Sequence, residues 1–175
     1  MSFVFKPGAH GRKPTESWAS TACAWRGACL EIYARGERSI DDCIAELEKL
    51  TGPIGHEAHH PGAAARARAL NEMLGRNRSS VHHPAAIRNL QNWIRLVAER
   101  PFLAHGVMKA RHGGVTIALS AHDGSSRNAM TPKHLNPFEM IAYLRRIDHA
   151  QRALNGQLGQ VRAAARRVRG GSEAA

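Results

Sequence analysis

The segment Pro84-Ala-Ala-Ile-Arg-Asn-Leu-Gln-Asn-Trp-Ile-Arg-Leu-Val-Ala-Glu-Arg100 decides the fold class of this chain. Four of its apolar residues recur at intervals of three and four, which places them on one face of an α-helix. These residues are Ile87, Leu90, Ile94 and Val97. Proline is favoured in the first turn of a helix, so Pro84 suits its start. Because Pro101 disfavours helical geometry at the preceding residue, the helix should end around Arg100.

Similar patterns upstream predict three further helices. The first is expected over about 15–35 and should end near Gly36. Ser39-Ile-Asp-Asp42 resembles a capping box and would open a second helix that stops before Gly52-Pro53. Strong helix formers predict the third helix over 63–74.

Downstream of the central segment the pattern changes. Val107–Arg111 and Val115–His122 are short β-type runs separated by His112-Gly-Gly114, which predicts a hairpin. Asn136-Pro-Phe-Glu139 then offers a helix N-cap, a proline in the first turn and a capping glutamate. A long final helix should follow and reach the basic stretch Arg162–Arg169.

The chain is therefore expected to be mainly α, a compact bundle of about five helices with a small β-hairpin before the last long helix. We expect a flexible arm over 1–13, a single helical domain over 14–168 and a flexible tail over 169–175. The length of 175 residues suits one domain with its own core.

Charge is the most unusual feature of the composition. The formal net charge is +11 and the isoelectric point is about 10.8, which favours polyanionic partners such as RNA, DNA or an acidic protein. A well-solvated basic surface would explain the same numbers. The three cysteines include no C-x-x-C pair and lie among apolar residues, which suggests buried thiols in a reducing compartment. With no signal-peptide pattern and no long apolar run, we expect a cytoplasmic protein without a membrane span.

One candidate for chemistry is the pair Arg100 and His105. Cleavage of RNA by its own 2′-hydroxyl needs a base that titrates near neutrality and a fixed cation near the phosphate. A histidine supplies the base and an arginine supplies a planar fork that fits phosphate oxygens. With Arg100 in the last helical turn and His105 on the exit loop, both side chains could reach one phosphate. An arginine that caps its helix and a histidine in the following turn would give the same spacing.

The segment Glu99-Arg-Pro-Phe-Leu-Ala-His-Gly106 resembles the R-x4-6-H motif of the HEPN superfamily, in particular its common form R-N-x-x-A-H-G. The resemblance implies a helical bundle that acts as a metal-independent endoribonuclease in a toxin–antitoxin or phage-defence system. It also implies a homodimer with a composite cleft, and a possible antitoxin partner. Arg100 would stabilise the scissile phosphate and His105 would act on the 2′-hydroxyl or the leaving oxygen. No cofactor is expected.

Pro101 stands where the family commonly has a polar residue, which keeps an alternative open: a catalytically inactive helical module that binds nucleic acid or a protein. If the last helix packs beside the motif helix, basic residues around the motif could form a phosphate-binding rim. The candidate residues are Arg95, Lys109, Arg111, Arg145 and Arg146. A solvated charged face is the simpler interpretation.

A third alternative is a zinc-dependent hydrolase, because His56-Glu-Ala-His-His60 matches H-E-x-x-H. In that motif two histidines on one helix face bind zinc while the glutamate activates water. Here Gly55 precedes the motif and Pro61-Gly62 follows it, which leaves room for one helical turn at most. A metal at His56 and His60 is therefore the weakest of the three interpretations.

Overall fold

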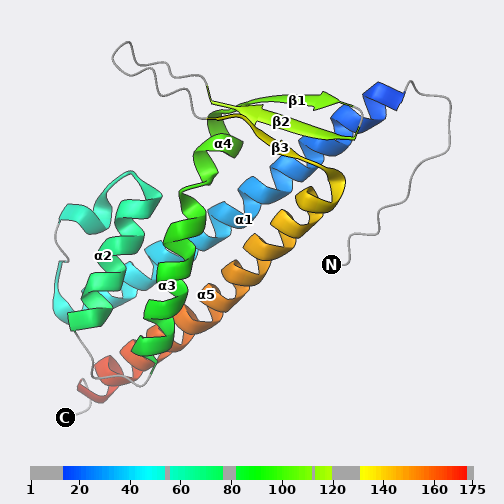
Figure 1. Cartoon of the computed structure of the whole chain (residues 1–175). Helices are drawn as coiled ribbons and strands as arrows, with labels where there is room; N and C mark the ends of the chain where they lie inside the picture. The colour runs from blue at the N-terminus through cyan, green and yellow to red at the C-terminus, as the bar shows by residue number, and fades with distance from the viewer. Residues whose placement is uncertain (1–13, 54–55, 77–81, 112, 120–130, 173–175) are drawn as a thin grey trace.

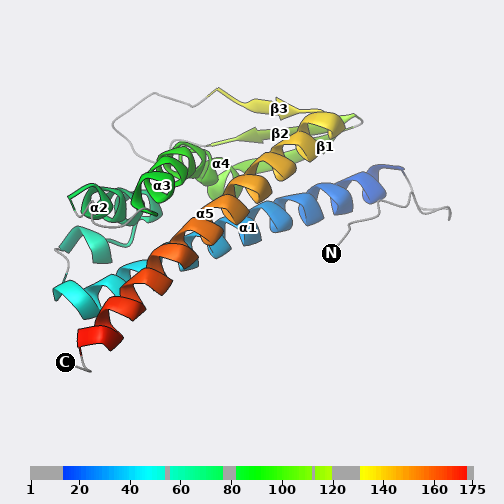
Figure 2. The same cartoon turned by 90° about the horizontal axis from the view of Figure 1, so that it is seen from below.

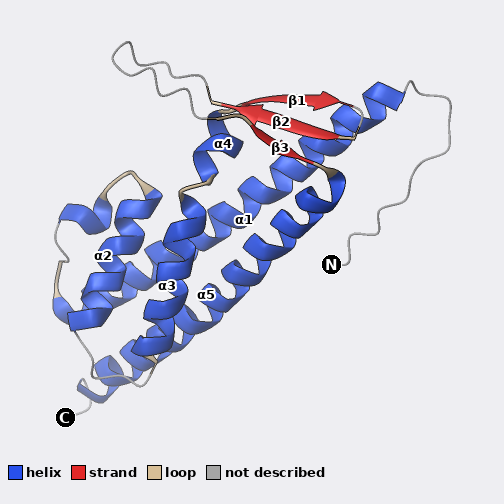
Figure 3. Ribbon diagram, viewed as in Figure 1, coloured by secondary structure: helices blue, strands red, loops and turns tan. Residues whose placement is uncertain are grey.

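The computed structural model describes residues 14–53, 56–76, 82–111, 113–119 and 131–172 (Figure 1). The protein is mainly helical, as the sequence predicted (Figure 3). In chain order the elements are α1 (Pro14–Thr51), the 3-10 turn η1 (His56–His59), α2 (Ala63–Arg76), α3 (His83–Val97), α4 (Arg100–His105), β1 (Val107–Arg111), β2 (Gly114–Ala118), β3 (Lys133–Leu135) and α5 (Pro137–Ser172). No described helix combines the length and apolar character needed to cross a membrane.

The two long helices α1 and α5 run side by side in the same direction (Figures 1 and 2). The Trp25 indole donates a hydrogen bond to the Met140 carbonyl near their start, at 2.8 Å. Helix α3 packs on α5 in the opposite direction, and α2 packs on α3. The core fills the space between these helices, with Trp93, Leu90 and Leu154 fully buried.

Residues 14–51 form one helix, so the prediction of two helices with a break near Gly36 is wrong. A Cβ atom at Gly36 would overlap the Trp93 ring of α3, which shows that glycine is needed here for close packing rather than for a helix end. Ser39 is no N-cap either. Its hydroxyl donates to the Arg35 carbonyl one turn earlier and lies 3.0 Å from the Asn155 side chain of α5.

The predicted central helix is α3, which ends at Val97, and a separate short helix, α4, follows where the sequence predicted an exit loop. Pro101 has no N–H to donate to Val97, so the helical ladder cannot continue across this point. Pro101 instead occupies the first turn of α4, where a missing N–H costs nothing. The Tyr33 hydroxyl of α1 donates to the Leu96 carbonyl at the break, at 2.9 Å.

The predicted hairpin is present, and a third strand extends it. Strand β2 lies between β1 and β3, and both pairings are antiparallel. The sheet covers the N-terminal halves of α1 and α5 (Figures 1 and 2). Val115 and Ile117 are buried beneath it. The second strand ends at Ala118, and positions 120–122 of the predicted run lie outside the described residues.

The predicted start of the last helix is confirmed. The Glu139 backbone N–H donates to the Asn136 side-chain oxygen at 2.9 Å, and the Asn136 N–H donates to the Glu139 carboxylate at 2.8 Å, which is a capping box. Helix α5 continues through Ser172, so the predicted tail over 169–175 is helical for its first four residues. The predicted arm over 1–13 lies outside the described residues.

Candidate nucleic-acid interface

Arg100 and His105 are the first and the last residue of α4, not a helix end and the loop after it. Phe102 and Leu103 between them are buried and anchor the short helix in the core. Gly106 ends it: a Cβ there would overlap the Phe102 carbonyl and the Ile117 side chain of β2. The chain therefore turns directly from α4 into β1.

The Arg100 guanidinium is held against α1 by an ion pair. Its Nε lies 2.9 Å from Glu37 Oε1, and the Arg100 side chain is 37% exposed. Arg66 of α2 lies 3.6 Å from the other oxygen of Glu37 and 2.7 Å from Asp41. The pair therefore belongs to a charge network that joins α1, α2 and α4.

His105 is exposed and lies away from this network. Five helical positions correspond to about 140° around the axis and about 7.5 Å along it. Arg100 and His105 therefore leave the helix in different directions. The expectation that both side chains of one chain reach a single phosphate is not supported by this arrangement.

A different arginine lies at the His105 end of α4. Arg26 of α1 donates from Nε to the Leu103 carbonyl at 2.5 Å and from Nη2 to the Ala104 carbonyl at 3.1 Å. Carbonyls at the C-terminal end of a helix have no partner inside the helix, and the Arg26 fork satisfies two of them. Nothing local in the sequence indicates this role, because the partners are separated by more than seventy positions.

Of the five basic residues of the expected rim, three lie on helices and two lie on a strand. Arg95 of α3 and Arg145 of α5 are exposed, and neither forms an ion pair within the described part of the chain. Arg146 is different: it lies 3.1 Å from Glu99 and its guanidinium stands 5.1 Å from the centre of the Tyr143 ring. Lys133 of β3 approaches the same glutamate at 3.6 Å. This part of the rim is therefore partly neutralised.

Lys109 and Arg111 are the two that lie on the sheet, in strand β1. The side chains of β1 alternate between half-buried and exposed, and these two point outward. Strand pairing places Thr116 of β2 opposite Lys109, and His134 of β3 opposite Thr116. The sequence gives no local signal for His134, because β3 has only three residues and shows no clear alternation.

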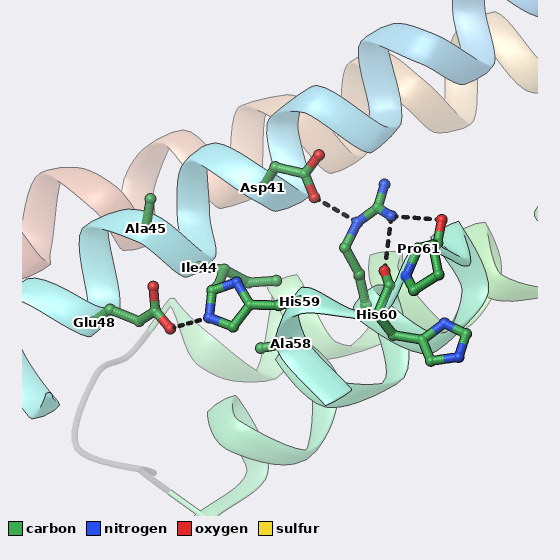
Figure 4. A pocket seen from close by; sticks show the side chains of 9 residues that line it. Asp41, Ile44, Ala45, Glu48, Ala58, His59, His60 and Pro61 are labelled. Carbon is green, nitrogen blue, oxygen red and sulfur yellow. Dashed lines mark hydrogen bonds and ion pairs between the residues drawn. The ribbon is translucent and has the colours of Figure 1, made fainter. Parts of the chain in front are cut away.

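The H-E-x-x-H segment does not form the α-helix that places the two histidines of this motif on one face. Residues 56–59 form one 3-10 turn and His60 lies beyond it; the side chains of His56 and Glu57 are outside the described part. His60 Nδ1 accepts a hydrogen bond from the Gly62 N–H at 2.9 Å, and His59 Nε2 lies 2.8 Å from Glu48 (Figure 4). No cluster of three metal-binding side chains occurs among the described residues.

The same histidines line a shallow hollow between α1, η1 and α2 (Figure 4). Its only arginine, Arg66, is already committed to Asp41 and to the carbonyls of His60 and Pro61. The polar groups of this hollow therefore bind one another.

Comparisons with protein-family models, curated proteins and solved structures find no match to this chain. The resemblance to HEPN proteins thus rests on the Glu99–Gly106 motif and the helical character of the chain.

Proposed function

We propose that this protein is an RNA-binding helical domain and that the Arg100–His105 motif is not a nuclease site within a single chain. The supporting observation is the contrast between two sets of cations. Arg100 is ion-paired with Glu37 at the opposite end of α4 from His105. Arg95, Lys109, Arg111 and Arg145 are exposed and free of ion pairs among the described residues. Exposed cations without acidic partners can bind a polyanionic backbone without first breaking an ion pair within the protein.

Binding to labelled single-stranded RNA, measured by fluorescence anisotropy, tests this proposal. Affinity should fall steeply as salt rises from about 50 to about 200 mM, because phosphate contacts release counterions. The RNA should stay intact during the measurement. Failure to bind RNA at low salt would rule the proposal out.

RNA cleavage is the second candidate, and the exposure of His105 favours it. A solvent-facing imidazole at the end of α4, next to the backbone held by Arg26, is accessible to an RNA strand. The resemblance to HEPN nucleases implies a homodimer. In that dimer, the Arg100–His105 motifs of the two copies would face each other across a shared cleft. A role in a toxin–antitoxin or phage-defence system, with an antitoxin partner, is part of this candidate.

Incubation of the protein with RNA in EDTA separates the two candidates. Cleavage that is lost in both Arg100→Ala and His105→Ala would establish the nuclease. Intact RNA that is bound in a salt-dependent way supports the binding domain.

A further inference from the structure

We infer that the outward face of the three-stranded sheet is where RNA phosphates bind, with Lys109, Arg111 and His134 as the donors. This inference rests on the proposed RNA-binding function and specifies its surface. The alternative surface is the helical part of the rim, which carries Arg95 and Arg145.

Strand register builds a row of polar groups across the sheet. Lys109, Thr116 and His134 are successive partners on β1, β2 and β3 and therefore point to the same side. Adjacent strands lie about 4.8 Å apart, so the row offers an ammonium group, a hydroxyl and an imidazole within reach of one phosphate. The Thr116 hydroxyl and His134 Nδ1 are 3.2 Å apart; when the hydroxyl donates in this bond, Nε2 carries the proton and can donate to an anion.

In the neighbouring row, the His134 ring covers the glycine that lies opposite the second cation. Arg111 pairs with Gly114, which has no side chain. A Cβ at Gly114 would come within 2.6 Å of the Leu135 carbonyl and 3.0 Å of the His134 ring. The His134 imidazole therefore lies over Gly114, the register partner of Arg111, which brings the imidazole and the second cation to neighbouring places on this face.

Local charge distinguishes this face from the helical part of the rim. No aspartate or glutamate occurs between Arg100 and His122, and none occurs in the three strands. Lys133 of β3 also pairs with Glu99, but it lies on the opposite side of the sheet, because its register partner is the buried Ile117. On the helices, Arg146 is paired with Glu99, and Arg152 lies 2.9 Å from Asp148. Carboxylates near a cation weaken its attraction for phosphate, so the sheet should bind RNA more strongly than the helices.

The chemistry of the face also indicates how RNA would be recognised. Lys109 and Arg111 are two residues apart on β1, about 7 Å along the strand. The three strands contain no Phe, Tyr or Trp on which a base could stack. Contacts to phosphates alone carry no sequence information, so binding should be similar for strands of different sequence.

Two double variants that each remove two positive charges test the inference. Lys109→Ala with Arg111→Ala removes the sheet cations, and Arg95→Ala with Arg145→Ala removes exposed, unpaired cations from the helices. The probe is labelled single-stranded RNA, and affinity is measured over a salt series. The sheet variant should bind on the order of tenfold more weakly at about 0.1 M salt, and its salt slope should fall by about 1.4. The helix variant should change affinity less than about threefold.

His134→Gln in the wild-type background provides an independent check, because it removes the imidazole and leaves both sheet cations in place. It should weaken binding several-fold. Equal losses in the two double variants, or a larger loss in the helix variant, would overturn the sheet assignment while RNA binding itself stands. Absence of RNA binding by the wild-type protein would overturn the proposed function.

Discussion

Trp93 of α3 lies directly against the backbone of α1 at Gly36, so closely that no side chain fits between them. Trp93 is fully buried and its ring also packs on Tyr33, with ring centres 5.5 Å apart. This contact determines how near α3 can lie to α1, and therefore where α4 and the sheet begin.

Gly36→Ala should destabilise the protein by about 1–3 kcal/mol or more, because the added methyl group forces Trp93 or α3 to move. Gly27 lies on the same helix with nothing within 4 Å of an added Cβ. Gly27→Ala is the matched control and should stabilise by up to about 1 kcal/mol through helix propensity. Urea titrations measure the free energy of unfolding of both variants. A neutral effect at Gly36 would show that the helices are not packed this closely.

The capping box at the start of α5 predicts a smaller effect. Asn136→Ala removes the oxygen that accepts the Glu139 N–H and should cost about 1 kcal/mol. Asn136→Ser keeps an accepting oxygen and should cost less. Thermal unfolding measures the stability of both variants. Equal losses of stability would mean that the hydrogen bond from the Glu139 N–H does not stabilise the start of α5.

The ion pair of Arg100 and Glu37 can be measured by a double-mutant cycle with Arg100→Ala and Glu37→Gln. Because Arg100 is partly exposed, water screens the pair and we expect a coupling of about 0.5–1 kcal/mol. A coupling near zero would indicate that Arg100 is free in solution. That result would make Arg100 available for chemistry at the surface.

Thiol reactivity tests which cysteine side chains of α1 are buried. Burial raises the pKa of Cys29 and of Cys43 from the ordinary value of 9.0 to about 12, whereas Cys23 is exposed. The expectation of three buried cysteines is therefore wrong for Cys23. A disulfide reagent at pH 8 should label one thiol in the native protein and all three after unfolding. Fast labelling of more than one native thiol would contradict the packing.

The same thiols predict loss of stability in alkali. The pKa of each buried thiol is higher in the folded protein than in the unfolded chain. The contribution of these thiols to the free energy of unfolding is therefore complete below pH 9 and declines as the pH rises toward 12. Tyr33 acts in the same direction, since burial raises its pKa from 10.0 to about 12. The free energy of unfolding from urea titrations should therefore fall between pH 9 and pH 11. A rise over this range would be inconsistent with buried, neutral groups.

The sequence predicted the features that depend on local chemistry. The helical class, the β1–β2 hairpin and the capping box at Asn136 and Glu139 were all found where periodicity and turn residues placed them. Tertiary contacts decided the rest. Gly36 resembles a helix end in sequence, yet it lies mid-helix because Trp93 needs the space.

The candidate site likewise combines residues that local sequence identifies with residues that only tertiary contacts reveal. The motif residues Arg100 and His105 could be found by their spacing, but their divergence depends on Pro101 starting a new helix instead of following an old one. Arg26, which holds the end of α4, and His134, which completes the polar row on the sheet, come from distant parts of the chain. No local pattern identifies either residue.

The salt dependence of RNA affinity in EDTA, with the length of the RNA checked at the end, tests the central claim most directly. We predict that log affinity falls linearly with log salt between about 50 and about 200 mM, and that the RNA is recovered whole. RNA that is not bound at the lower salt concentration, or that is cut by the wild-type protein and spared by both Arg100→Ala and His105→Ala, would contradict it.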